Sequence, residues 1–300
     1  MLLLCYGYTP LIPIIFNRWR YCDMTIGKEI HLHLVSDSTG ETTYQMARAA
    51  LAQFPSAQVI EHVWTLVRTP DHIPAIANSI KEHEGVVFYS ISDTKIRKLL
   101  EEVCHATHVP CLSILDHAVH ILSKRLGQPS TGEIGAQHRM DEAYFHRMEA
   151  LDFAVHHDDG QGLNNLTEAD ILLVGVSRTS KTPTSIYLAN RGYKVANYPL
   201  VPGVAPPLAS IKASGVLVVG LIKDARQLAH IRRNRLRAMQ QQEKMDYDDI
   251  QAIKAELANA RQLYQQNNWA VIDVTRKSVE ETAAEIINIY RQTETGTGKM

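Results

Sequence analysis

Several features that mark large classes of proteins are scarce in this sequence. It contains four cysteines in 300 residues without a repeating spacing, which argues against a disulfide-stabilised extracellular domain and favours free thiols in the reducing cytoplasm. Its formal net charge is −1, so the overall charge does not favour binding to nucleic acid or to an anionic membrane surface. Internal repeats and low-complexity tracts are absent from the sequence.

Long hydrophobic runs are missing as well. Residues 1–23 are apolar, but prolines and polar residues such as Asn17 and Arg18 interrupt them, whereas a membrane-spanning helix needs roughly 20 mostly apolar residues. The positive charges follow the apolar part and no small-residue cleavage site is present, which argues against a signal peptide. We therefore predict that Met24 is the true start and that residues 1–23 are a disordered or mis-annotated extension.

The sequence does contain enough hydrophobic residues, 45% of the chain, to bury one large core or two modest ones. Strand-like and helix-like segments alternate in its first half, which predicts an α/β domain with a mostly parallel sheet over residues 24–135. The expected strands are residues 30–35, 59–67, 85–91 and 111–115. The expected helices are residues 41–54, 73–83 and 94–103. In the first strand, alternation places His31 and His33 on one face. A glycine-containing loop, residues 127–138, follows.

The residues after the first expected strand, Ser36-Asp-Ser-Thr-Gly40, have two interpretations. Hydroxyl groups at the start of a helix can bind an anion. Alternatively, Ser38 or Thr39 caps the helix through a side-chain hydrogen bond. From the residues alone we favour capping.

Two cysteines and two histidines lie close together in Cys104-His-Ala-Thr-His108-Val-Pro-Cys111. Their spacing matches no common zinc pattern, and Pro110 indicates a loop that leads into the next strand. We therefore expect separate core or surface residues here rather than a metal site.

The most informative stretch is residues 169–192. The apolar run 171–174 predicts a buried parallel strand. A segment with helical spacing follows, with Pro183 suited to its first turn and Gly192 to its end. Strand, loop and helix in this order bring free backbone N–H groups and the positive end of a helix to one point, which suits a phosphate group.

The loop between them matches the phosphate-binding pattern G-x-x-x-x-G-K-[ST] except at its second glycine, which is Ser180. The alternative is an ordinary turn with an exposed lysine. We favour phosphate binding: Lys181 and the loop N–H groups hold the phosphates, Thr182 reaches Mg²⁺, and Arg178 stabilises transferred charge. The expected nucleotide-binding residues are Gly175, Val176, Ser177, Arg178, Thr179, Ser180, Lys181 and Thr182.

Two adjacent carboxylates, Asp158 and Asp159, follow an expected helix over residues 141–156. The partial negative charge at a helix C-terminus repels carboxylates, so such a pair often has a function. They are candidates for binding Mg²⁺ or for orienting and deprotonating a hydroxyl group. A solvated turn ended by Gly160 is the alternative.

The rest of the chain predicts a second α/β domain of the P-loop kinase-like class over residues 165–300, with residues 136–164 as the connection. Its further strands are expected at residues 194–200, 215–221 and 269–274, and its helices at residues 228–239 and 248–265. Ser278 and Glu281 predict a capping box that starts a final helix. Asp224 loosely matches the aspartate that holds a metal ion in phosphate-loop proteins.

The 228–239 helix carries four arginines: Arg232, Arg233, Arg235 and Arg237. In a nucleotide kinase such a helix can close over the phosphates as a lid. A solvated basic face is an equally weighted interpretation.

Several longer stretches closely resemble the pyruvate, phosphate dikinase regulatory proteins. The loop itself reads Gly175-Val-Ser-Arg-Thr-Ser-Lys-Thr-Pro-Thr, and in that family Ser180 belongs to the pattern. The other similar stretches are residues 31–42, 144–150, 157–160, 187–202 and 273–284. Together they span about residues 28–290. The match at 157–160 favours a functional role for Asp158 and Asp159 without assigning a role to either.

The resemblance implies a bifunctional serine/threonine kinase and phosphorylase. Members of the family use ADP to phosphorylate a threonine of pyruvate, phosphate dikinase, which inactivates it, and remove that phosphate with inorganic phosphate as acceptor, producing pyrophosphate. A sister family acts on phosphoenolpyruvate synthase. Two rivals stay open: a small-molecule kinase that uses ATP, and a non-catalytic nucleotide-binding regulator in which the two aspartates are dispensable. The sequence does not fix the oligomeric state, and a homodimer is one alternative.

Overall fold

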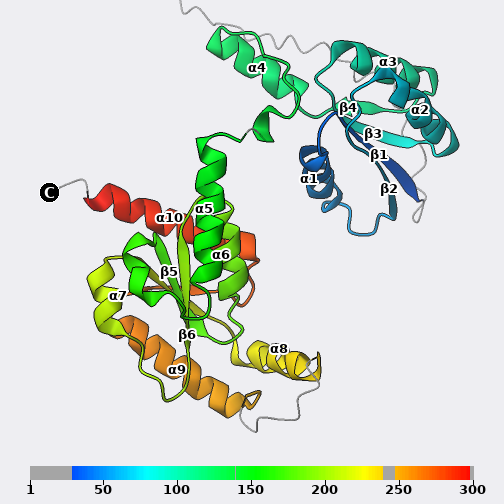
Figure 1. Ribbon diagram of the computed structural model, residues 1–300. Helices are drawn as coiled ribbons and strands as arrows, with labels where there is room; N and C mark the ends of the chain where they lie inside the picture. The colour runs from blue at the N-terminus through cyan, green and yellow to red at the C-terminus, as the bar shows by residue number, and fades with distance from the viewer. Residues whose placement is uncertain (1–28, 139, 239–246, 298–300) are drawn as a thin grey trace, which may run out of the picture. The chain divides into compact units, whose positions relative to one another are not determined.

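The computed structural model describes residues 29–138, 140–238 and 247–297, and the chain divides into two compact units between residues 138 and 139. Each unit contains a four-stranded sheet in which every pair of neighbouring strands is parallel (Figure 1). The predicted fold class, two α/β parts built on parallel sheets, is confirmed. The proposed start at Met24 and the expected helix end at Met239 lie outside the described residues.

The first unit has strand order β2-β1-β3-β4. Its elements are β1 (Ile30–Ser36), α1 (Glu41–Leu51), β2 (Val59–Trp64), α2 (Ile73–Glu82), β3 (Gly85–Ser90), α3 (Thr94–Ala106), β4 (Cys111–Ser113) and α4 (Asp116–Leu126). The predicted elements are all present, with ends shifted by a few residues. Helix α4 was not predicted. It has no buried residue, so no core contact imposes a clear apolar pattern on its sequence.

The expected side-chain cap of α1 is wrong. The N-cap residue is Gly40, whose backbone has φ 80°, and no side chain caps the helix. A left-handed backbone at this position is available to glycine without strain, so the chain enters the helix through Gly40 rather than through Ser38 or Thr39. The backbone N–H of Ser38 instead donates to the Ser36 hydroxyl at 3.1 Å.

The two cysteines in the described part of the chain are neighbours in the first unit. Cys104 lies near the end of α3 and is buried, whereas Cys111 begins β4 and is exposed. A hydrogen bond between the two thiols raises the pKa of Cys104 and lowers the pKa of Cys111. Among the residues that the structure describes, no group of three or more His, Cys, Asp or Glu side chains is arranged to hold a metal ion.

Four imidazole rings cluster on one face of the first sheet. His31 and His33 come from β1, His62 from β2, and His83 directly follows α2. The ring centroids of neighbouring pairs lie 4.6–5.1 Å apart. Burial is the main cause that lowers the pKa of His33 and of His62, and repulsion among the rings lowers both further.

This cluster predicts a loss of stability in mild acid. Since the folded-state pKa of His62 lies below the unfolded value of about 6.5, the unfolded chain binds more protons there, and the free energy of unfolding falls as pH falls from about 6.5 through the folded pKa. Urea unfolding between about pH 8 and pH 5.5 measures this. The His62→Gln variant, which removes a partly exposed ring, should show a smaller pH dependence. An unchanged pH dependence contradicts the prediction.

The second unit has strand order β6-β5-β7-β8. Its elements are α5 (Glu142–His156), a 3-10 helix (Leu163–Glu168), β5 (Ile171–Val176), α6 (Lys181–Ala189), β6 (Val195–Leu200), α7 (Leu208–Ser214), β7 (Leu217–Ile222), α8 (Ala225–Ala238), α9 (Ile250–Gln266), β8 (Ala270–Asp273) and α10 (Val279–Thr297). Helix α5 packs on α6 and β6 within this unit. The short helix α7 was not predicted. No helix in the described part of the chain has both the length and the apolar composition needed to cross a membrane.

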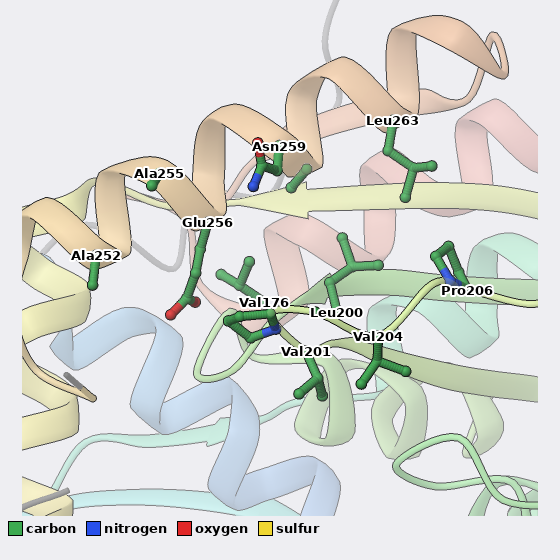
Figure 2. Close-up of a pocket in the computed structure, with 13 residues that line it drawn as sticks. Val176, Leu200, Val201, Val204, Pro206, Ala252, Ala255, Glu256, Asn259 and Leu263 are labelled. Atoms are coloured by element: carbon green, nitrogen blue, oxygen red, sulfur yellow. The ribbon is translucent and has the colours of Figure 1, made fainter. Parts of the chain in front are cut away.

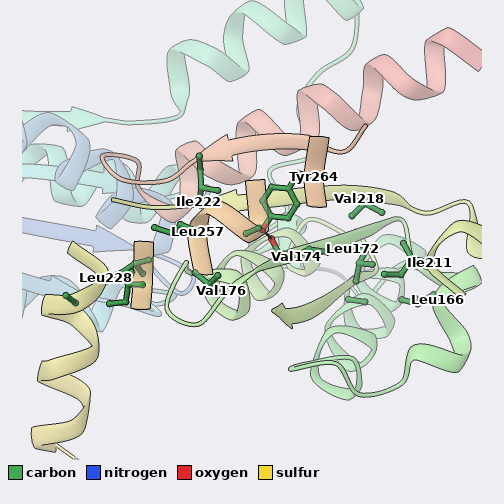
Figure 3. Close-up of a cluster of buried hydrophobic side chains, with 14 of the residues drawn as sticks. Leu166, Leu172, Val174, Val176, Ile211, Val218, Ile222, Leu228, Leu257 and Tyr264 are labelled. Carbon is green, nitrogen blue, oxygen red and sulfur yellow. Dashed lines mark hydrogen bonds between the residues drawn. The ribbon is translucent and has the colours of Figure 1, made fainter. Parts of the chain in front are cut away.

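Strand β5 lies in the middle of the second unit's core. All of its residues are buried, as expected for a strand with both faces covered. Leu172 and Val174 belong to the apolar cluster on one face, which also contains Leu257 and Tyr264 from α9 (Figure 3). Ile171 belongs to the cluster on the other face. This packing fixes the end of β5, and therefore the start of the loop that follows it.

Two local predictions in this unit are confirmed. The backbone N–H of Ser278 donates to Glu281 Oε2 at 2.8 Å, and the N–H of Glu281 donates to Ser278 Oγ at 3.1 Å, which is the reciprocal capping box. The strand, loop and helix around residues 171–192 also form as predicted, with α6 starting at Lys181.

Candidate functional site

The 175–182 loop makes a tight turn between β5 and α6. Arg178 and Ser180 both have left-handed backbones, with φ 72° and 67°. A Cβ atom at Gly175 would lie 2.7 Å from the hydroxyl of Thr179 and 3.0 Å from the carbonyl oxygen of Leu221, so the turn requires glycine at this position. The Thr179 hydroxyl donates to the Val176 carbonyl at 2.9 Å, which holds the turn closed.

Ser180, the residue that departs from the general phosphate-binding pattern, has the backbone conformation that favours glycine. Ser180 is the N-cap of α6 and adopts the left-handed backbone that glycine occupies without strain. For a residue with a Cβ atom this conformation costs about 1–2 kcal/mol. The loop therefore keeps the geometry that the pattern's second glycine would give, at a cost in backbone strain.

Lys181 is a buried cation at the start of α6. Its side chain is 6% exposed, and Nζ donates to the carbonyl oxygens of Gly175 at 2.9 Å and Val176 at 3.2 Å. Burial lowers its pKa to about 8, although the nearby Asp159 and Asp158 act in the opposite direction. None of the ion pairs between described residues includes Lys181.

The two adjacent aspartates have different environments. Asp158 Oδ1 accepts hydrogen bonds from the Thr182 hydroxyl at 2.9 Å and from the side-chain amide of Asn197. Asp159 has φ 49°, and its backbone N–H donates to Asn197 Oδ1 at 3.0 Å. The turn thus directs Asp158 to the helix that starts at Lys181, whereas Asp159 borders the adjacent cavity.

Asn197, a buried residue in β6, fastens this turn to the sheet, and sequence reasoning did not single it out. Besides the side-chain bonds, its backbone N–H donates to the His157 carbonyl at 3.0 Å and its carbonyl accepts from Gly160 N–H at 2.9 Å. The His157 ring stacks on Phe153, with centroids 3.7 Å apart. The sequence signals were a polar residue inside the expected strand 194–200 and its position in the similar stretch 187–202.

A cavity of about 560 Å³ lies over the loop and helix start. The predicted site residues that line it are Asp159, Ser177, Arg178, Ser180, Lys181 and Thr182. Gly175, Val176 and Thr179 are not among its lining residues and form the support of the loop, and Asp158 reaches the site through Thr182. The structure therefore brings the expected catalytic and phosphate-binding residues together at one end of the second sheet.

Neither interpretation of the arginine helix holds for Arg232. This side chain is 1% exposed and forms a bidentate ion pair with Glu256, at 3.1 and 2.7 Å. It also donates to the carbonyl oxygens of Ser177 at 3.3 Å and Tyr247 at 3.0 Å. Because Arg232 is buried and both of its terminal nitrogens donate hydrogen bonds, it is neither a mobile lid nor a solvated residue. Through its hydrogen bond to the Ser177 carbonyl, Arg232 stabilises the 175–182 loop.

The other charged residues of this segment have simpler roles. Arg233 pairs with Asp248 at 2.9 Å, and Arg235 and Arg237 are exposed. Asp224 was a loose candidate for holding a metal ion, but its carboxylate accepts from the N–H groups of Arg226 and Gln227 at the start of α8. It therefore serves as a helix cap.

The loop after β1 in the first unit lines a smaller cavity of about 220 Å³. Hydroxyl groups of Ser36, Ser38 and Thr42 border it, which favours the anion interpretation of this loop. Asp37 is buried there, with its carboxylate accepting from the Ser92 N–H at 2.6 Å, and Glu41 lines the cavity too. Glu133 lines the cavity as well, and three carboxylates in so small a space oppose a bound anion.

Residues 32–287 of the chain match the kinase/pyrophosphorylase family. A protein of Paramagnetospirillum magneticum is 47% identical over 274 residues, covering 91% of this chain and 88% of that protein. Proteins of Rhizobium meliloti and Caulobacter vibrioides are 50% and 49% identical, covering 86% of this chain and 94% and 82% of their own lengths. All three are named as pyruvate, phosphate dikinase regulatory proteins. A solved ABC-transporter solute-binding protein from Agrobacterium vitis, 9% identical, covers 82% of this chain and 92% of its own, with a TM-score of 0.22 that is too low to support an argument.

Proposed function

The chain belongs to the kinase/pyrophosphorylase family, and we propose that it regulates a pyruvate, phosphate dikinase by reversible phosphorylation. In one direction it transfers the β-phosphoryl group of ADP to a threonine of the dikinase, which inactivates it. In the other direction it transfers that group to inorganic phosphate and releases pyrophosphate. The observation that carries this proposal is the single cavity that holds the cation of Lys181 beside the carboxylate of Asp159.

In the ADP-dependent direction, Lys181 and the N–H groups at the start of α6 bind the two phosphates. The threonine oxygen attacks the β-phosphorus, the bond to the bridging oxygen breaks, and AMP leaves. Asp159 accepts the threonine proton, since it borders the cavity, whereas Asp158 is engaged with Thr182 and Asn197. Arg178 lines the same cavity and stabilises charge on the transferred group.

In the phosphate-dependent direction, the same groups act in reverse. An oxygen of inorganic phosphate attacks the phosphothreonine phosphorus, and the bond to the threonine oxygen breaks. The proton of the attacking phosphate passes to Asp159, which gives it to the threonine oxygen, and pyrophosphate leaves. Both directions therefore place two linked phosphates over Lys181 and the threonine oxygen near Asp159, so one site serves both.

The site also has groups suited to Mg²⁺. The carboxylate of Asp158 and the hydroxyl of Thr182 lie 2.9 Å apart and supply hard oxygen ligands, of the kind that Mg²⁺ shares with substrate phosphates. We propose that these two residues hold the ion. When bound, Mg²⁺ would neutralise part of the negative charge of the phosphates.

The proposal is tested by incubating the purified protein with a dikinase and ADP, then with phosphate. We expect one threonine to gain a phosphoryl group, with AMP formed in equal amount, and phosphate to remove that group with release of pyrophosphate; mass spectrometry of the dikinase follows both steps. AMP in place of ADP is the control for the donor. If the dikinase stays unmodified and phosphoenolpyruvate synthase is modified, the target assignment is wrong. If neither is modified, the proposed function is wrong.

A further inference from the structure

A second cavity, of about 490 Å³, lies directly beside the phosphate cavity. One wall is a stripe of α9 that includes Ala252, Ala255 and Asn259, and the opposite wall is the chain after β6 (Figure 2). Leu200 and Val201 line both cavities, which are therefore neighbours with a common wall. Its volume is in the range of roughly 300–1,000 Å³ that is usual for small-molecule sites.

The chemistry of this second cavity differs from that of the first. Its lining is mostly apolar, with Val176, Leu200, Val204 and Leu263 among its residues and no lysine or arginine. It therefore suits an uncharged, largely apolar group rather than a phosphate. The small side chain of Ala255 leaves room on the α9 side.

Two polar residues line the cavity on α9. Glu256 is already engaged, because both of its oxygens accept hydrogen bonds from Arg232. Asn259 is exposed and supplies an amide that can donate and accept at once, which is what the edge of an adenine ring requires. Its place in the lining gives the cavity one hydrogen-bonding group for a base.

We propose that this cavity binds the adenine base of ADP, while the phosphates occupy the adjoining cavity over Lys181. The inference rests on the proposed function for the identity of the nucleotide. It adds the place where the base is recognised and the residues that recognise it. Because Leu200 and Val201 line both cavities, the base and the phosphates of one nucleotide would lie in adjoining cavities.

This assignment separates the two reactions. The ADP-dependent reaction needs a base site, whereas inorganic phosphate and pyrophosphate have no base. Blocking the apolar cavity should therefore impair phosphorylation of the dikinase and spare phosphate-dependent removal. A general defect in the site would impair both.

The test fills the cavity with the Ala255→Phe variant. Ala258→Phe is the matched control, because Ala258 is also an exposed alanine of α9 but does not line the cavity. We expect Ala255→Phe to raise the Kd of ADP, measured by calorimetry, at least about 10-fold, to leave the Kd of pyrophosphate within about twofold, and to raise the KM for ADP in parallel. Asn259→Ala should raise the Kd of ADP about 10-fold without the added bulk.

Each outcome decides the proposal. An unchanged Kd of ADP in Ala255→Phe overturns it, and so does an equal weakening of ADP and pyrophosphate. The binding measurements need no dikinase, so they remain decisive if the dikinase is not modified. In that case a selective loss of ADP binding supports the base site, although the proposed function fails.

Discussion

Replacing Lys181 with alanine is expected to abolish both reactions, with kcat/KM lowered by about 10³-fold or more in each direction. Lys181 is buried beside the loop, and both directions place two linked phosphates over its charge. Without it, those phosphates would face the carbonyl oxygens of Gly175 and Val176, which now accept hydrogen bonds from Nζ. Initial rates with the dikinase measure the effect.

The matched control is Lys212→Ala, which removes an exposed lysine of α7. It should retain full activity. Thermal unfolding of both variants shows whether a loss of activity comes from the missing charge or from unfolding of the protein. If Lys181→Ala is folded and retains either activity, the loop does not bind the transferred phosphate and its assigned role is wrong.

The same lysine predicts a pH dependence. Because burial lowers its pKa to about 8, the free protein loses the Lys181 charge as pH rises through that value. The kcat/KM of both reactions, which reports ionisation of the free protein, should therefore decline above about pH 8. Rates measured in small pH steps check this. A kcat/KM that stays constant to about pH 9.5 would show that the charge is not needed or is not lost.

Replacing Asp159 with asparagine is expected to slow the ADP-dependent reaction about 10²- to 10⁴-fold while leaving ADP binding nearly unchanged. The substitution keeps the size of the side chain but removes the group that accepts the threonine proton. Its backbone N–H bond to Asn197 is retained, so the turn should keep its conformation. Single-turnover rates and calorimetry with ADP separate chemistry from binding.

Asp158→Asn is the informative comparison. Asp158 accepts hydrogen bonds from Thr182 and Asn197, so its replacement should weaken Mg²⁺ binding and loosen the turn rather than remove the proton acceptor. We therefore expect added Mg²⁺ to restore part of the activity of Asp158→Asn and none of that of Asp159→Asn. If both variants still bind nucleotide and still regulate the dikinase as the unchanged protein does, a non-catalytic nucleotide-binding regulator is favoured. The reverse pattern of Mg²⁺ rescue would exchange the two roles.

Local patterns in the sequence determined much of this protein. The apolar run of β5, Gly175, Lys181 and Gly192 specify a strand, loop and helix among near neighbours, and all three form. The capping box of α10 depends on residues three positions apart, and it too was predictable. Where a structure depends on a few adjacent residues, periodicity and side-chain chemistry are enough to predict it.

Contacts between distant parts of the chain were decided only by the tertiary structure. Arg232 was expected either on a lid or in solvent, yet it is buried against Glu256 and the Ser177 carbonyl, which is 55 positions away. Asp158 and Asp159 are distinguished by their contacts with Asn197, on a strand that follows the loop. The carboxylate of Asp158 accepts from the Asn197 amide, whereas Asp159 contacts Asn197 through its backbone N–H. No local pattern encodes such pairings, because they arise when the sheet and its helices pack into one core.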